Sequence, residues 1–301
     1  MNNIINEKEC QEKISRLVKK IQMKKYYNKT VVDFLYCEGE IERATRVKDC
    51  ATHIGFAYED NVVKISSADF CRERMCHVCC WRKQSKFVAV MTPVLQEVKA
   101  QGYEFIFLTL TVQNVGADLL SESIDMIMRA YNKFLGRKKV QVAFVGSMRS
   151  VEITYNEKEN TYHPHVHVLA VVDPDYFSDP TKYISQRELC ALWRDCACLD
   201  YEPICHVEKV SNLARGQLET LKYALKPTRD WKALECFFSV LKGRRLISFC
   251  GILKKYRKEY DASMSELSDF VRKSNYNEYL YKFDVTGGVY RFYEQQYHKR
   301  E

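Results

Sequence analysis

Hydrophobic residues recur every three or four positions over several stretches of the chain, the spacing that lines one face of an α-helix. Residues 1–36 are polar and Lys-rich and are predicted to form one helix. Within a second helix, 83–100, Pro93 is expected to kink or restart the backbone, because proline lacks an N–H and crowds the preceding turn. The other predicted helices cover 118–135, 186–198 and 212–226, and Pro227 ends the last of them.

Stretches rich in β-branched and aromatic residues alternate with these helices and predict strands. Two of them, 142–155 and 163–172, are joined by the short polar stretch Asn156–Thr161 and are expected to form a hairpin. The remaining extended stretches are 103–115 and 203–210. The pattern therefore predicts an α+β fold in which helices flank a central antiparallel sheet.

The second hairpin strand carries three histidines at alternate positions, His163, His165 and His167. Because side chains alternate between the two faces of a strand, the three imidazoles share one face. The residues between them and the alternate residues that follow would then face the core: Pro164, Val166, Val168, Ala170 and Val172. Two imidazoles at positions i and i+2 are able to bind one metal ion.

The hairpin register is expected to bring a carboxylate to the same face. A six-residue connection pairs Tyr155 with Tyr162 and therefore Glu152 with His165, and a shift of one residue would remove Glu152 from the histidine face. The predicted ligands are Glu152, His165 and His167, with His163 as a further candidate. Two imidazoles and a carboxylate with open positions suit Mg²⁺ or Mn²⁺. The alternative is a solvated, histidine-rich hairpin that binds no metal.

A tyrosine with charged neighbours lies in the predicted helix 212–226. Glu219, Lys222, Tyr223 and Lys226 are spaced to share one helical face. A neighbouring apolar stripe is expected to dock the helix, and its members are Leu218, Leu221 and Leu225. A phenol becomes a nucleophile when a metal or cations favour its deprotonation, and Glu219 could act as a general base. An ordinary exposed helix surface is the alternative.

Thirteen cysteines stand out in a chain of 301 residues, which is long enough to fold without disulfides. The chain shows no signal-peptide pattern and no uninterrupted apolar run of ~18 residues, so we expect a cytoplasmic protein with no membrane partner and with reduced thiols. The segment 37–82, expected to be irregular, holds the main cluster. Its predicted Zn²⁺ ligands are Cys50, Cys71, Cys76 and Cys79, with His53, His77 and Cys80 as rivals for the fourth position. Four others are assigned to the core: Cys190, Cys196, Cys198 and Cys205.

The chain is basic, with 47 Lys and Arg against 39 Asp and Glu, a formal net charge of +8. This balance suits a polyanionic partner such as DNA. Basic residues with interleaved aromatic residues are typical of surfaces that bind single-stranded DNA. The candidate DNA contacts are Arg82, Lys83, Lys86, Arg137, Lys138, Lys139, Lys222, Arg244 and Arg245.

Four motifs in order resemble a known family. FLTLTVQN (107–114), HPHVHVL (163–169) and E-x-x-x-Y-x-x-K (219–226) follow the Cys-rich CRERMCHVCCWRK (71–83). Over about residues 50–230 the chain is similar to the rolling-circle replication initiators of small Gram-positive plasmids, members of the HUH endonuclease superfamily. His77 and Cys80 depart from the pattern of these relatives within the Cys-rich segment.

The resemblance implies a fold and a mechanism. The fold would be an HUH-type central antiparallel sheet with a Cys-rich zinc module on its N-terminal side. A divalent ion on His165 and His167 would polarise the scissile phosphate, and Tyr223 would attack it, leaving a 5′-phosphotyrosine and a free 3′-OH primer. Glu219 would direct hydrolytic termination and Lys226 would neutralise phosphate charge. The resemblance assigns no catalytic role to Thr109, Thr111 or Asn114.

The implied partners are the plasmid double-strand origin, including single-stranded or extruded hairpin DNA, and a host helicase and polymerase, with a dimer on DNA as one arrangement. The expected segments are a basic helical region 1–49, a zinc module 50–82, a nicking and joining domain 83–230 and a basic, aromatic region 231–301. Two alternatives stay open. One is a relaxase or transposase with the same chemistry, and the other is a non-catalytic, zinc-containing DNA-binding regulator.

Overall fold

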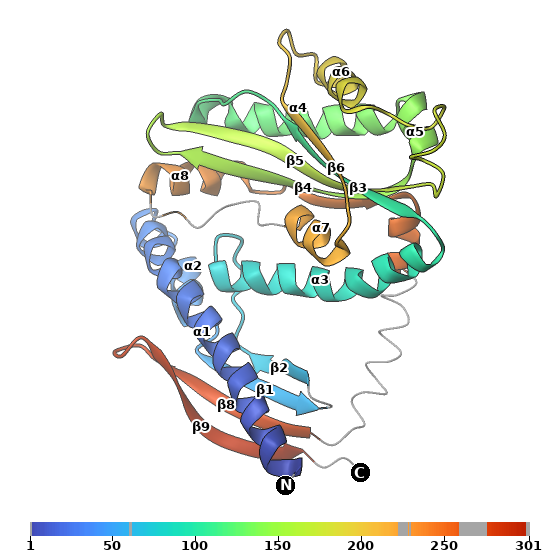
Figure 1. Cartoon of the computed structure of the whole chain (residues 1–301). Coiled ribbons are helices and arrows are strands. Elements are labelled where there is room, and N and C mark those ends of the chain that lie inside the picture. Colours follow the sequence, from blue (N-terminus) through green and yellow to red (C-terminus); the bar gives the residue numbers. More distant parts are fainter. Residues whose placement is uncertain (1, 60–61, 222–227, 229, 259–275, 299–301) are drawn as a thin grey trace. The chain divides into compact units, whose positions relative to one another are not determined.

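The computed structural model describes residues 2–59, 62–221, 228, 230–258 and 276–298 (Figure 1). The chain divides into two compact units, each built from segments that are distant in sequence. The first unit comprises 1–83, 227–235 and 264–301, and the second comprises 84–226 and 236–263. In the part of the chain that is described, no helix is both long and apolar enough to cross a membrane.

The second unit contains a five-stranded antiparallel sheet in the order β6-β3-β5-β4-β7. Its strands are β3 (Glu104–Thr111), β4 (Phe144–Asn156), β5 (Thr161–Val172), β6 (Cys205–Lys209) and β7 (Ile247–Cys250). The predicted α+β class, with antiparallel sheets flanked by helices, is confirmed. The predicted register is confirmed as well, since Tyr155 pairs with Tyr162 and Glu152 with His165.

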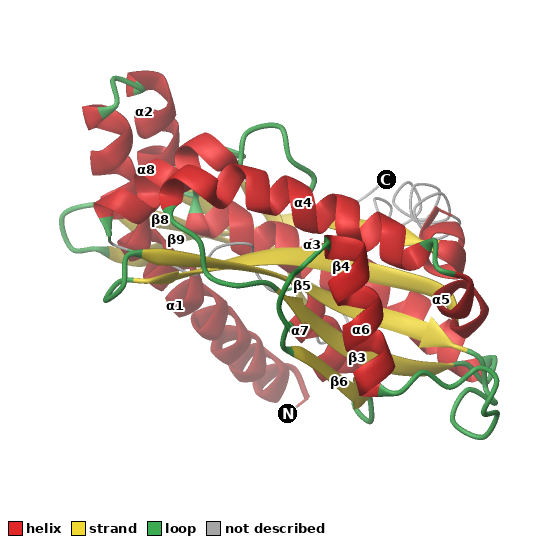
Figure 2. Cartoon of the chain, turned by 90° about the horizontal axis from the view of Figure 1, so that it is seen from above, coloured by secondary structure: helices red, strands yellow, loops and turns green. Residues whose placement is uncertain are grey.

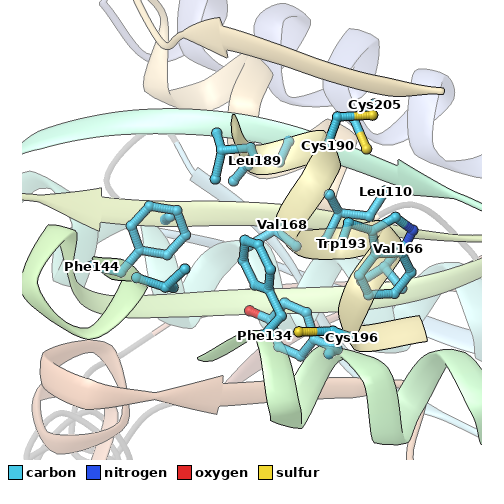
Figure 3. Packing of buried hydrophobic residues seen from close by; sticks show 14 of the residues in the cluster. Leu110, Phe134, Phe144, Val166, Val168, Leu189, Cys190, Trp193, Cys196 and Cys205 are labelled. Atoms are coloured by element: carbon cyan, nitrogen blue, oxygen red, sulfur yellow. The ribbon is translucent and has the colours of Figure 1, made fainter. Parts of the chain in front are cut away.

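Helices cover both faces of this sheet (Figures 1 and 2). One face packs against α4 (Ala117–Leu135), α5 (Lys138–Ala143) and α6 (Gln186–Ala197), and the other against α3 (His77–Ala100) and α7 (Leu213–Thr220). The strand residues Val166 and Val168 meet Phe134 and Trp193 on the first face (Figure 3). The other face packs Leu169 and Val171 of β5 against residues of α3. Both faces of β5 are therefore buried, the predicted core face and also the face that carries the histidines.

Two predictions need correction. Helix α3 begins at His77, earlier than the predicted start at residue 83, and it continues past Pro93 as one element, so the backbone does not restart there. Of the four cysteines assigned to the core, Cys190, Cys196 and Cys205 are buried, whereas Cys198 is exposed. Cys198 ends α6 in the left-handed conformation, which turns its side chain away from the core face of the helix.

The first unit contains a four-stranded antiparallel sheet in the order β2-β1-β8-β9, with α1 and α2 in the same unit. The elements are α1 (Asn2–Cys37), α2 (Ile41–Asp49), β1 (His53–Glu59), β2 (Val62–Ala68), β8 (Tyr276–Asp284) and β9 (Val289–His298). The prediction that 37–82 is irregular is wrong. Strand β1 finds its partner in β8, more than 200 residues away, and β2 is an exposed edge strand with little apolar alternation. Helix α8 (Trp231–Val240) contains the sequence boundary, after residue 235, between segments assigned to the first and second units.

Candidate metal centres

The β4–β5 hairpin brings Glu152, His165 and His167 together on one face of the sheet. Glu152 Oε2 lies 2.8 Å from His167 Nε2 and 3.4 Å from His165 Nε2, and the two Nε2 atoms are 3.1 Å apart. All three side chains are buried. Three potential ligand atoms thus converge on one point.

In His165 and His167, hydrogen bonds of the Nδ1 atom, on the far side of the ring from Nε2, fix the orientation of the imidazole. His165 Nδ1 lies 3.1 Å from the His163 carbonyl oxygen, which only accepts hydrogen bonds, so Nδ1 carries the proton and the neutral ring keeps a lone pair on Nε2. His167 Nδ1 lies 3.2 Å from Thr109 Oγ1. Thr109 sits on β3 directly across from His167. Both imidazoles therefore present Nε2 toward Glu152, the arrangement in which histidine binds a metal.

The spacing of the three atoms fits a divalent ion. Ligands at ~2.1 Å on adjacent corners of an octahedron lie ~3.0 Å apart. The observed separations of 2.8, 3.1 and 3.4 Å bracket this value. One carboxylate and two imidazoles on one face leave the remaining positions open to substrate oxygens.

Glu152 is held in the ionised form that a metal ligand requires. Burial by itself would raise the pKa of Glu152, but its contacts with the His165 and His167 imidazoles outweigh burial and bring the pKa well below the usual range.

His163, the further candidate, lies outside this group of three. Its ring stacks on that of His165 at 5.1 Å, and burial followed by the nearby His165 charge lowers its pKa.

Helix α7 is fixed to the same sheet by its buried side. The Ser150 hydroxyl, on the residue directly across from His167, donates to the carbonyl of Thr220 at the end of α7. Gln217 donates through Nε2 to the Val88 carbonyl of α3 at 2.8 Å. Gly216 permits the close approach, since a Cβ there would lie 3.0 Å from Val210.

The predicted docking stripe of this helix is partly wrong. Leu221 is buried, but Leu218 is 49% exposed, because the helix docks through Gly216, Gln217 and Thr220 instead. Glu219 is half-buried. Tyr223, Lys222, Lys226 and Leu225 lie outside the described residues.

Cys50, Cys71, Cys76 and Cys79 form the second cluster, in the first unit. Cys79 Sγ lies 3.5 Å from the sulfurs of Cys50 and Cys71, and Cys76 Sγ lies 3.6 Å from Cys50 Sγ. A disulfide would need ~2.05 Å, whereas four sulfurs at ~2.3 Å from a tetrahedral ion lie ~3.8 Å apart. Hydrogen bonds with the other three thiols lower the pKa of Cys76, which favours thiolate, the form that binds metal. The cluster therefore fits a metal ion.

The three rival ligands lie outside this cluster of four. His53 pairs with Asp69 at 3.2 Å, and the Cys80 thiol donates to the Arg74 carbonyl at 2.8 Å. The His77 ring contacts that of Tyr27, and burial lowers its pKa to about 4. Cys50, more than twenty residues upstream of the other three cysteines, is therefore the fourth member of the cluster.

The basic residues selected from the sequence fall into two groups. The side chains of Lys83, Lys86, Lys138 and Arg245 are exposed. Others have intramolecular partners: Arg82 lies over the Phe70 ring, Arg137 donates to Cys196, Lys139 pairs with Glu188 and Arg244 pairs with Asp125. The exposed group is therefore better placed to contact DNA phosphates.

Replacing Thr109 with valine is expected to weaken binding of a divalent ion to the histidine site by ~10–100-fold, because His167 loses the hydrogen bond that orients it. Valine keeps the branched shape of threonine in the strand. Thr111→Val is the matched control, since that hydroxyl donates to the Ile204 carbonyl instead. Mn²⁺ titration followed by electron paramagnetic resonance measures the affinity. Equal affinities in the two variants would show that Thr109 does not orient His167.

Known proteins resemble this chain over most of its length. The family model described as Replication protein matches residues 62–298. A Protein rep of Streptococcus pneumoniae is 32% identical over 274 residues, which cover 87% of this chain and 85% of that protein. A Protein rep of Lentilactobacillus hilgardii is 36% identical over 237 residues, with coverages of 72% and 75%. One from Staphylococcus aureus is 39% identical over 184 residues, with coverages of 60% and 80%. No solved structure was found to match.

Proposed function

The chain belongs to the replication protein family, and from this premise we propose that it nicks a plasmid origin strand to start rolling-circle replication. Family membership confirms the motif resemblance and implies a role in initiating plasmid replication. The nicking chemistry is our proposal. The observation that carries it is the convergence of Glu152, His165 and His167 within 3.4 Å on the face to which α7 is fixed.

In the proposed reaction the phenolic oxygen of Tyr223 attacks the scissile phosphorus in line. A bond forms between this oxygen and phosphorus as the bond from phosphorus to the 3′-oxygen breaks. The phenol gives up its proton, and the 3′-oxygen takes one to become the primer hydroxyl. Glu152, His165 and His167 would hold a Mg²⁺ or Mn²⁺ ion, which supplies positive charge to the phosphate oxygens. Lys226 would neutralise phosphate charge beside the nucleophile.

The attachment of α7 to the sheet supports the assignment of Tyr223 as the nucleophile. Ser150 ties the Thr220 carbonyl to the strand position across from His167. Tyr223 follows Thr220 by three residues, a length of chain that spans at most ~11 Å. The proposal therefore requires Tyr223 to reach the scissile phosphate from within that distance of Thr220.

The remaining features fit the same proposal. The five-stranded sheet would be the HUH domain, the cysteine cluster would hold a structural Zn²⁺, and the exposed lysines and arginines would contact origin DNA, single-stranded or extruded as a hairpin. A host helicase and polymerase would extend the primer in the cytoplasm. Binding to DNA should weaken steeply with salt, because each phosphate contact releases counterions.

A covalent-adduct assay tests the proposal. The protein is incubated with supercoiled plasmid bearing its own origin, with Mn²⁺, Mg²⁺ or chelator, and denatured before electrophoresis. We expect nicked plasmid with protein attached to the 5′ end, formed only with a divalent ion. If no adduct forms with any divalent ion while the protein still binds the origin, a non-catalytic DNA-binding regulator is the better description.

Replacing Glu219 with alanine is expected to leave the first nick and its adduct intact but to block hydrolytic release of the DNA. The reason is that Glu219 would activate the water that attacks the phosphotyrosine, a step that follows nicking. Adduct lifetime is measured by quenching a single-turnover reaction at intervals. Glu235→Ala, on α8, is the control. Normal release from Glu219→Ala would remove Glu219 from the mechanism.

A further inference from the structure

Two side chains of α1 reach the cysteine cluster from a part of the sequence that has no cysteine motif. Lys25 Nζ donates to the Cys50 carbonyl at 2.7 Å and to the Lys48 carbonyl at 3.3 Å. Asn28 Nδ2 donates to Cys76 Sγ at 3.2 Å, and Asn28 Oδ1 accepts from the His77 N–H at 2.8 Å. Both side chains are buried, at 7% and 3% exposure.

The charge of a metal-bound cluster explains why a lysine is buried there. Four thiolates around one divalent ion carry a net charge of −2, and burying that charge is costly unless donors and cations surround it. Backbone N–H groups of Arg72, Cys71 and Glu73 point at the sulfurs of Cys79, Cys50 and Cys71. These groups are neutral. The hydrogen-bond acceptors of Lys25 are neutral carbonyls, one of them the carbonyl of Cys50 itself. Burial lowers the pKa of Lys25, and the nearby cluster sulfurs and the exposed Asp49 partly oppose that shift.

Contacts around Lys25 and Cys50 also connect the β8–β9 hairpin to the cluster. Lys25 Nζ lies 4.6 Å from the centre of the Phe283 ring on β8. The Phe283 N–H donates to the Thr52 carbonyl at 2.8 Å, and the Tyr290 hydroxyl of β9 donates to the Ala51 carbonyl at 2.5 Å. Residues 51 and 52 directly follow the ligand Cys50. Three distant stretches of the chain therefore meet around one set of sulfurs.

We propose that Lys25 and Asn28 are positioning residues of the cysteine metal site, so that metal binding fixes α1 and the β8–β9 hairpin to the cluster. Lys25 supplies the buried positive charge and Asn28 the side-chain donor to Cys76. The inference rests on the proposed occupancy of the cluster by Zn²⁺. As a consequence, the bound metal orders α1 and the β8–β9 hairpin in addition to the four cysteine ligands.

Metal affinity of Lys25 variants tests the charge assignment. Metal-free protein is titrated with Co²⁺, followed by the thiolate-to-metal absorption band, and Zn²⁺ affinity is obtained by competition. Lys25→Met is expected to weaken affinity by ~10–100-fold, Lys25→Arg to restore most of it, and Lys29→Met, on the exposed side of α1, to change nothing. Asn28→Leu is expected to weaken affinity as Lys25→Met does, with a shifted absorption band.

Hydrogen exchange of the full-length wild type supplies a second readout. On metal removal we expect protection to fall in α1 around residues 25–28 and in β8–β9, with β3–β5 unchanged. If the wild type binds neither Co²⁺ nor Zn²⁺, the proposed metal occupancy is wrong. If it binds them but Lys25→Met binds equally well, or if the hairpin keeps its protection without metal, the occupancy stands and the role of α1 is refuted.

Discussion

Tyr223→Phe is expected to bind origin DNA but to form no covalent adduct and to leave supercoiled plasmid intact. The substitution removes a single oxygen, the atom proposed to attack phosphorus, and keeps the ring. Loss of a nucleophile lowers turnover by orders of magnitude, here at least ~10⁴-fold, because the oxygen that would form the bond to phosphorus is gone.

Tyr183→Phe is the matched control for this variant. Tyr183 lies in the same unit and is 45% exposed, so loss of its hydroxyl should not alter nicking. Adduct formation is measured on end-labelled origin oligonucleotides, and binding on the same oligonucleotides by fluorescence anisotropy. An adduct formed at normal rate by Tyr223→Phe would assign the attack to another residue.

Cys76→Ser is expected to remove the metal from the cysteine cluster and to destabilise the first unit strongly. Cys76 is fully buried and its sulfur lies within hydrogen-bonding distance of Asn28 and Cys50. A ligand present at a thousand times its dissociation constant stabilises a fold by ~4 kcal/mol, and that stabilisation is lost with the site. For a unit of this size the expected fall in melting temperature is ~10–20 °C.

Thermal unfolding with and without chelator measures this effect, together with the zinc content of the purified protein. Cys37→Ser is the control, because Cys37 is an exposed thiol at the end of α1. The same fall should appear in the wild type treated with a strong chelator. Unchanged melting of both Cys76→Ser and chelated wild type would show that metal binding at the cluster does not stabilise the unit.

The histidine site could be predicted because all of its ligands lie on one short hairpin. The polar turn between Asn156 and Thr161 fixes the register, and the alternation of side chains then places Glu152 across from His165. The cysteine cluster could be predicted for a related reason, because only cysteine supplies the thiolate that this kind of metal site requires. Short stretches of sequence therefore suffice to predict the histidine site from strand geometry and the cysteine cluster from side-chain chemistry.

Long-range pairing was not predictable in this way. Strand β1 carries an alternating strand pattern in Ile54, Phe56 and Tyr58 that was missed, but nothing in that pattern identifies β8 as its partner. The hydrogen bond between Thr109 and His167 depends on the β3–β5 register, which no turn specifies. Lys25 could not be linked to the cluster, because a lysine in a polar helix normally faces water.

The interleaving of the two units sets an order of events during synthesis. All five strands of the sheet in the second unit leave the ribosome before β8 and β9, whereas β1 emerges early and has only β2 beside it. Until residues 276–284 arrive, one edge of β1 has no strand to pair with, and such an edge is a template for intermolecular pairing. A chain that stops short of β8 would therefore keep Glu152, His165 and His167 and lose protection against aggregation at the unpaired edge of β1.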